Sequence, residues 1–226
     1  MPRITEERRE ARRQQILDAA RACVLEHGLE AASMEMIIAR SGLSTGAVYR
    51  YFKGKDEIIG AAFTAAADEI GAALAPILAG PQPGLPSELA GKLLTAWVGY
   101  SLGGTGATAG LDRMPVALHG WSYAQTDPKL KASLQAGLRG FRQACVPLVQ
   151  QWQAEGVVAA TADPDAVAQL LLSIVLGFVV QRSLTGDADV QAHSAALAAL
   201  TNGQRVAGPS ASSTQPALAN RAGAGS

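Results

Sequence analysis

Apolar residues recur with helical spacing along most of the chain, and the period-two alternation of strands is hard to find. Near the N-terminus, one stripe with a period of 3.6 residues contains Ile16, Leu17, Ala20, Cys23 and Val24. This stripe predicts a helix over 5–27, with Thr5 at its N-cap and Gly28 as its C-terminal stop. The pattern as a whole predicts an all-α fold.

The same periodicity predicts the remaining elements. We expect helices at 34–40, 45–51, 56–78, 87–102, 114–125, 129–153, 165–185 and 190–200. Pro76 and Pro147 lie inside two of these helices and predict a kink or a helix end. Ser87 is the expected N-cap of the helix that follows the Pro- and Gly-rich loop at 80–86. From residue 203 the composition turns to Gly, Ser, Ala and Pro, which predicts a disordered tail over 203–226.

Charge is sparse and balanced. The 226 residues have a formal net charge of zero and only 17 % charged side chains, which argues against a general nucleic-acid coat protein. DNA binding would therefore need a local patch, and two basic clusters are present: Arg3, Arg8, Arg9, Arg12 and Arg13, then Arg50, Lys53 and Lys55. The first cluster fits an arm that reaches DNA, or a solvated helix start paired with nearby glutamates.

Several other functions find no support in the sequence. Cys23 and Cys145 lie in apolar stretches and indicate buried thiols of a reducing cytosol, and no Cys/His spacing indicates a metal. The charged N-terminus is unlike a signal peptide, and the apolar run 166–180 is short for a membrane span. The string 104–109 matches G-x-G-x-x-A but follows a helical stretch, not a strand. We expect a cytoplasmic protein without catalytic residues, metal, cofactor or membrane contact.

The segment 33–52 has the features of a helix-turn-helix. A short helix ends at Ser41, and Gly42 supplies the positive φ that a tight corner needs. Leu43 can fill the corner, and Ser44 can N-cap a second short helix. Such a second helix can enter the major groove of DNA.

The outward residues of this second helix suit DNA contact. Thr45 can touch a base or a phosphate, and Gly46 lets the backbone approach closely. Tyr49 and Tyr51 offer hydroxyls to phosphates, while Arg50 and Lys55 add positive charge. Isolated aromatic residues of this kind would be ordinary surface and core residues, so the spacing is what favours DNA binding.

Residues 12–63 resemble the DNA-binding domain of TetR-family regulators. The shared positions are Ser33, Ile37, the turn Ser41-Gly42-Leu43-Ser44, Gly46, the run 49–52 and Lys55. Two departures are Ile38 after the helix-two Ile and Gly54 in place of a common Ser before Lys55. The resemblance implies phosphate binding at Ser33, base contact at Thr45 and Gly46, and backbone contact at Tyr49 and Lys55. The candidate DNA-binding residues are therefore Ser33, Ser44, Thr45, Gly46, Tyr49, Arg50, Tyr51 and Lys55.

The resemblance also implies the domain plan and the partners. We expect a helix-turn-helix domain at 1–57 and a ligand-binding and dimerisation domain at 58–202. The protein would be a repressor, released from a double-stranded, palindromic operator by a small, largely apolar or aromatic effector. There are two alternatives: an activator of the same fold, and a ligand-binding adaptor that no longer binds an operator.

Two faces of the C-terminal part are expected to bind partners. Helix 165–185 is apolar nearly all round, which predicts a homodimer interface at Leu170, Ser173, Ile174, Gly177 and Val180. Aromatic and Met positions on the central helices predict a ligand pocket lined by Trp97, Tyr100, Met114, Leu118, His119, Trp121, Phe141 and Phe178. Such a stripe is more often plain core. A ligand with an anionic head group is also compatible with this part of the chain, because it contains Arg113, Arg139, Arg142 and Arg182.

Overall fold

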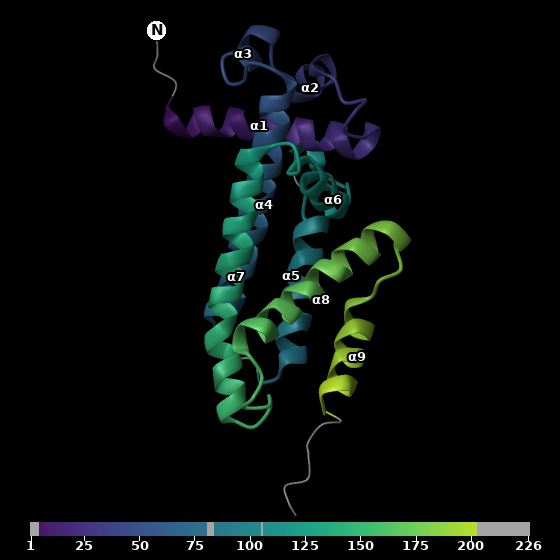
Figure 1. The fold of residues 1–226 in the computed structure, drawn as a ribbon. Coiled ribbons are helices and arrows are strands. Elements are labelled where there is room, and N and C mark those ends of the chain that lie inside the picture. The colour runs from purple at the N-terminus through teal and green to yellow at the C-terminus, as the bar shows by residue number, and fades with distance from the viewer. Residues whose placement is uncertain (1–4, 81–83, 105, 203–226) are drawn as a thin grey trace, which may run out of the picture.

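The computed structural model describes residues 5–80, 84–104 and 106–202, and within them it is helical without strands, which confirms the all-α prediction. The elements are α1 (Glu6–His27), α2 (Met34–Ser41), α3 (Thr45–Tyr49), α4 (Lys55–Ala79), α5 (Pro86–Leu102), the 3-10 turn η1 (Gly106–Thr108), α6 (Met114–Tyr123), α7 (Pro128–Ala154), α8 (Pro164–Thr185) and α9 (Val190–Asn202). Figure 1 shows α1 lying across one end of the molecule, with α4, α5 and α7 running lengthwise away from it.

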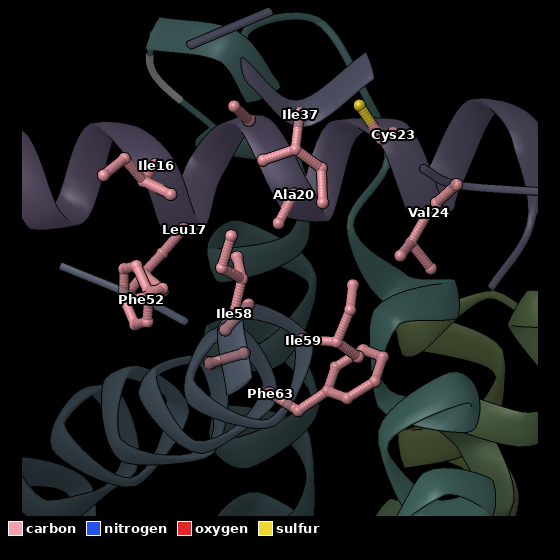
Figure 2. Close-up of a cluster of buried hydrophobic side chains, with 14 of the residues drawn as sticks. Ile16, Leu17, Ala20, Cys23, Val24, Ile37, Phe52, Ile58, Ile59 and Phe63 are labelled. Carbon is pink, nitrogen blue, oxygen red and sulfur yellow. The ribbon is translucent and has the colours of Figure 1, made fainter. Parts of the chain in front are cut away.

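The first core holds the N-terminal helices together. The stripe predicted on α1 is buried, and Ile37 of α2 and Val48 of α3 have no exposed surface. Figure 2 shows Ile58, Ile59 and Phe63 of α4 beneath α1. Burial of these aliphatic side chains stabilises the short helices α2 and α3, which would be marginal alone.

The first core does not end with α3. It includes the first turns of α4 and also Val116 of α6, Ala124 just after α6 and Leu130 of α7. The predicted domain boundary between residues 57 and 58 thus falls inside this core. α6 packs on α4 at Gly120, where an added Cβ would be in ordinary van der Waals contact with the Phe63 ring at 3.5 Å.

A second core fills the other end of the bundle, between α4, α5, α7 and α8. Trp152 of α7 and Phe178 of α8 are its largest fully buried side chains, each 1 % exposed. α9 packs against α5, and the edge of the His193 ring on α9 meets Phe178 at 5.0 Å between ring centroids. α4 contributes to both cores and so connects the two ends of the molecule.

Two expectations about helix ends were wrong. α4 and α7 do not end at Pro76 and Pro147 but continue through them, because the residues beyond each proline are held in the second core, such as Trp152. Ser87 does not cap α5: Leu85 stands at the N-cap and Pro86 opens the helix, a position where proline loses no hydrogen bond. Thr5 is at the N-cap of α1 as predicted, and its side chain makes no capping hydrogen bond. The tail 203–226 and Arg3 lie outside the described residues.

Two helices, α4 and α8, are long and apolar enough to cross a membrane by length and composition alone. α8 has 22 residues, so the argument that its apolar run is too short for a span was wrong. The same test is passed by a core helix of a soluble protein, and α4 packs against α1, α5, α6 and α7. Length is therefore weak evidence for a membrane here.

Candidate nucleic-acid interface and ligand cavity

Capping hydrogen bonds fix the helix-turn-helix. The Ser33 hydroxyl accepts from the Met36 amide at 3.3 Å, and the Ser44 hydroxyl accepts from the Ala47 amide at 3.3 Å. Between them, Gly42 adopts the left-handed conformation with φ 66° and ψ 11°. The polar side chains satisfy amides that a helix start leaves unpaired. The predicted turn is confirmed at the residues that make it.

α3 presents a polar face to solvent. Thr45, Gly46 and Arg50 are exposed, and Tyr49 keeps 52 % of its surface accessible. The orientation of this face is set from behind, because Val48 is fully buried in the first core. Tyr51 differs from its neighbours: it is half-buried and packs against that core.

The fold gives no reason for glycine at position 46. A Cβ added there would meet nothing within 4 Å, and the residue does not have a positive φ. Glycine inside a helix costs roughly 0.5–1 kcal/mol relative to alanine. An absent side chain on the exposed face of α3 is instead what close contact with another molecule requires.

Two hydrogen bonds hold the start of α4 next to the exposed face of α3. Gly54 gives no side-chain cap. The Glu57 carboxylate accepts from the Lys53 amide at 2.7 Å and so fixes the residue before the N-cap to the first turn of α4. The Lys55 ammonium donates to the Glu30 carbonyl at 3.2 Å, which ties α4 to the segment between α1 and α2.

Two of the N-terminal arginines have partners on their own helix. Arg9 lies 3.9 Å from Glu6, and Arg13 lies 3.4 Å from Glu10 while its guanidinium stands 5.8 Å from the Phe52 ring centre. Both ion pairs are exposed. These contacts match the interpretation of the cluster as a solvated helix start.

A cavity of about 820 Å³ opens between α4, α5, α6, α7 and α8. This volume is in the range of small-molecule sites. Four of the predicted pocket residues lie on its wall: Trp97, Tyr100, Trp121 and Phe141. The wall is largely apolar, with Arg113 as the one basic lining residue among those described.

The other four predicted pocket residues do not line this cavity. Met114 is 1 % exposed and its sulfur lies 3.6 Å from the Ser101 hydroxyl, while Phe178 packs in the second core. Leu118 and His119 are half-buried on α6, away from the wall. Much of the wall comes instead from α4 and α7, at positions such as Leu74 and Leu138. The apolar residues in the second half of α4 were the feature of the sequence that could have predicted this part of the wall.

A buried polar cluster lies between α1 and the cavity. The Arg21 guanidinium, 1 % exposed, donates to the two Glu69 carboxylate oxygens at 2.9 and 3.1 Å and to the Ala62 carbonyl at 3.1 Å. It also lies 3.3 Å from Asp18, whose pKa is raised because burial outweighs the nearby arginine. An ion pair thus joins α1 to α4.

The cluster reaches the cavity wall through Tyr100. Its hydroxyl donates to the Glu69 carboxylate at 3.2 Å. Burial, with a further contribution from that carboxylate, raises the pKa of Tyr100 to about 12. The Arg113 guanidinium stands 4.2 Å from the centre of the Tyr100 ring and 3.7 Å from Glu69. One carboxylate on α4 therefore contacts both α1 and the cavity wall.

α8 has an apolar face that the described residues leave exposed. Leu170 and Leu184 are 61 % and 73 % exposed, and Ser173 is exposed between them. Ile174, Gly177 and Val180 are half-buried. Only 28 % of the most apolar 18-residue stretch of α8 is buried. Space is open beside Gly177, where an added Cβ would meet nothing within 4 Å.

Within the described residues, no group of three or more His, Cys, Asp or Glu side chains could hold a metal ion. Cys23 and Cys145 are both free and buried. Burial raises the pKa of both thiols, that of Cys145 to about 11. Neither thiol has the lowered pKa of a reactive cysteine.

Two family models match the chain. Residues 16–62 match the model of bacterial regulatory proteins of the tetR family, and residues 106–205 match the C-terminal model of BetI-type transcriptional repressors. The HTH-type transcriptional repressor Rv1474c of Mycobacterium tuberculosis is 40 % identical over 58 residues, which are 26 % of this chain and 31 % of that protein. The HTH-type transcriptional repressor AcnR of Corynebacterium diphtheriae is 35 % identical over 79 residues, 35 % of this chain and 40 % of that protein. The matched part of the chain thus spans less than half the length of these curated relatives.

Solved structures share the fold over most of the chain. GusR of Salmonella enterica superposes with a TM-score of 0.63 at 22 % identity, covering 89 % of this chain and 98 % of that one. SmeT, the repressor of the Stenotrophomonas maltophilia multidrug efflux pump SmeDEF, gives a TM-score of 0.59 at 24 % identity, covering 84 % and 88 %.

Proposed function

Because the chain belongs to the TetR family of bacterial regulators, we propose that it is a transcriptional repressor that binds a palindromic operator as a homodimer and leaves it when a small, largely apolar or aromatic ligand enters the cavity. Family membership makes the chain a DNA-binding regulator and not an enzyme, as the sequence predicted. Such a regulator would act in the cytoplasm.

The observation that supports DNA binding most directly is the exposed face of α3. Its glycine at position 46 has no structural cause, and Tyr49 is the large aromatic side chain that the face offers to solvent. Ser33 and Ser44 place two helix N-termini near this face, and such termini bind phosphates favourably. Thr45 and Gly46 would face base edges, while Tyr49, Arg50 and Lys55 would hold the phosphate backbone.

The uncovered face of α8 supports the homodimer. Leu170, Ser173, Gly177 and Leu184 follow one another at steps of three, four and seven residues, so they lie on one side of the helix. A second copy of α8 could approach closely at Gly177. Two-fold symmetry would then set two copies of α3 about 34–36 Å apart, on successive major-groove turns of a palindrome.

α4 provides a route from ligand to DNA. Its first turns belong to the core behind α3, and its second half forms one wall of the cavity. A ligand that displaces the second half would move the DNA-binding unit with it and change the separation of the recognition helices. A coupling free energy of about 1–3 kcal/mol would weaken operator binding roughly 5- to 150-fold.

Selection of genomic fragments from the source organism tests this function. The purified full chain is incubated with the fragments at about 0.15 M salt, where nonspecific binding is moderate. We expect enrichment of one palindromic sequence. Failure to enrich any sequence, in a protein that is folded and dimeric, would contradict the repressor.

Three variants sharpen the test. Gly46→Ala should retain or raise stability yet lose the enrichment, because the new methyl group stands between α3 and the bases. Tyr49→Ala should also lose it. Gly99→Ala is the matched control, since this glycine lies on α5 with nothing within 4 Å of an added Cβ. Equal enrichment by Gly46→Ala and Gly99→Ala would show that α3 does not face DNA.

A further inference from the structure

Arg113 is a buried cation at the cavity wall. It precedes α6, and its side chain is only 10 % exposed. One guanidinium nitrogen donates to the Tyr100 carbonyl, and the guanidinium stacks on the Tyr100 ring. Its Nε is buried and has no hydrogen-bond partner in the described part of the chain. A buried donor without an acceptor costs free energy, so the hydrogen-bonding capacity of this guanidinium is not fully used within the described residues.

The charge of Arg113 is only partly compensated within the described residues, where Glu69 is its ion-pair partner and Asp18 acts on it from farther away. The distance to Glu69 is long, at 3.7 Å. Both carboxylate oxygens of Glu69 already accept from Arg21, at 2.9 and 3.1 Å. A guanidinium whose nearest carboxylate is already engaged by a second, better placed guanidinium can still pair with a further anion.

The rest of the cavity wall determines which kind of ligand body can carry that anionic group. Leu74 and Leu78 of α4, Trp121 of α6 and Leu134 and Phe141 of α7 line the wall. Asp68, the one acidic lining residue among those described, is exposed. A ligand therefore meets a positive charge near Tyr100 and an apolar surface elsewhere.

We propose that the effector is an acid with an apolar body, and that its carboxylate binds Arg113. This inference rests on the proposed function of the cavity as an effector site and names the chemical class of the effector. The aromatic rings of the wall could attract a cation instead. However, the guanidinium of Arg113 already occupies the Tyr100 ring. The positive charge of this guanidinium would repel a ligand cation.

Binding of three probes with one apolar body and different charge tests the proposal. Decanoate, decanol and decyltrimethylammonium are titrated into the full chain below their aggregation concentrations. Trp97 and Trp121 line the cavity, so tryptophan fluorescence reports binding. We expect decanoate to bind roughly 10- to 150-fold more tightly than decanol, as a hydrogen bond to a charged group allows. Equal affinity of acid and alcohol, tighter binding of the cation, or no binding of decanoate would overturn the proposal.

Variants of Arg113 assign the preference to this residue. Arg113→Gln should bind decanoate no better than decanol, and Arg113→Lys should keep part of the preference because it keeps the charge. Arg139→Gln is the matched control, since Arg139 is exposed on α7 and does not line the cavity. If Arg113→Gln does not fold, as judged by its urea midpoint, the comparison with Arg113→Lys decides. An undiminished preference in both variants would refute the assignment.

The two proposals can fail separately. Operator enrichment is measured without any probe, so its absence contradicts the repressor and leaves the acid preference to be judged by fluorescence. If the operator is enriched normally but decanoate binds no better than decanol, the proposal of an acidic effector is contradicted and the proposal of a repressor is not.

Discussion

Removing one partner of the ion pair between Arg21 and Glu69 should strongly destabilise this fold. The pair connects α1 to α4 over 48 positions of sequence, and the Arg21 side chain is 1 % exposed. Glu69→Gln keeps the size of the side chain and removes its charge. The Arg21 guanidinium then remains buried with Asp18 at 3.3 Å as its one ion-pair partner in the described structure.

The magnitude follows from the burial of the two partners. Removal of one member of a fully buried pair costs about 3–5 kcal/mol, because the other charge is left uncompensated. Here Glu69 is 34 % exposed and Asp18 stays in place, so solvent and the second carboxylate reduce the loss. We expect Glu69→Gln to lower the free energy of unfolding by about 2–3 kcal/mol, or the melting temperature by roughly 4–12 °C.

Urea unfolding followed by circular dichroism measures this loss. The matched control is Glu6→Gln, which removes the same group from the Arg9 pair at 3.9 Å, where the side chains are 68 % and 84 % exposed. That change should stay within about 0.5 kcal/mol. The double variant Arg21→Met with Glu69→Met should lose less than the sum of its single changes, because neither charge is left buried alone. A loss below about 1 kcal/mol in Glu69→Gln, or additive effects in the double variant, would refute the reasoning.

Three further predictions concern the dimer face, a surface ion pair and a buried thiol. Leu170→Arg should convert the dimer to a monomer in sedimentation experiments, whereas the same change at Leu102, which is 56 % exposed on α5, should not; a dimer that survives Leu170→Arg contradicts the α8 interface. Hydrogen bonding to Arg40 lowers the pKa of Glu26 from 4.5, so the stability from this pair is present above pH 4.5 and is lost as the pH falls through the lowered pKa. In a carbon-detected NMR titration, Arg40→Gln should move the Glu26 midpoint upward, and an unmoved midpoint would speak against the pair. Because burial raises the pKa of Cys145 to about 11, its thiol should react with a disulfide reagent at about pH 8 only after unfolding; immediate reaction of the folded protein is the contrary result.

The helix-turn-helix could be predicted because its determinants are local. Ser33, Gly42 and Ser44 act on amides and dihedral angles within three residues of themselves. Their effect is therefore visible in a short stretch of sequence. The apolar stripe of α1 was predictable for the same reason, since its period alone shows which side is buried.

The cavity could be predicted only in part, because its wall is assembled from five helices. Trp97 and Phe178 look alike as apolar helical positions and both pack in the second core, yet only Trp97 also lines the cavity. Arg21 likewise looked like one more charge on the first helix. Its role depends on Glu69, which is brought beside it only by the packing of α4 on α1. The spacing of apolar residues shows which side of a helix is buried, but it does not show which other helix packs against that side.

The continuity of the first core across residue 57 bears on how hybrid regulators are assembled from such proteins. A splice directly after Glu57 would join a foreign α4 to α1 and would replace Ile58, Ile59 and Phe63, which fill the space beneath it. The foreign chain would also have to supply matching partners for Val116 and Leu130. A working exchange of sensors must therefore transplant these contacts with the helix-turn-helix, and the inherited unit of DNA recognition is larger than the segment that reads DNA.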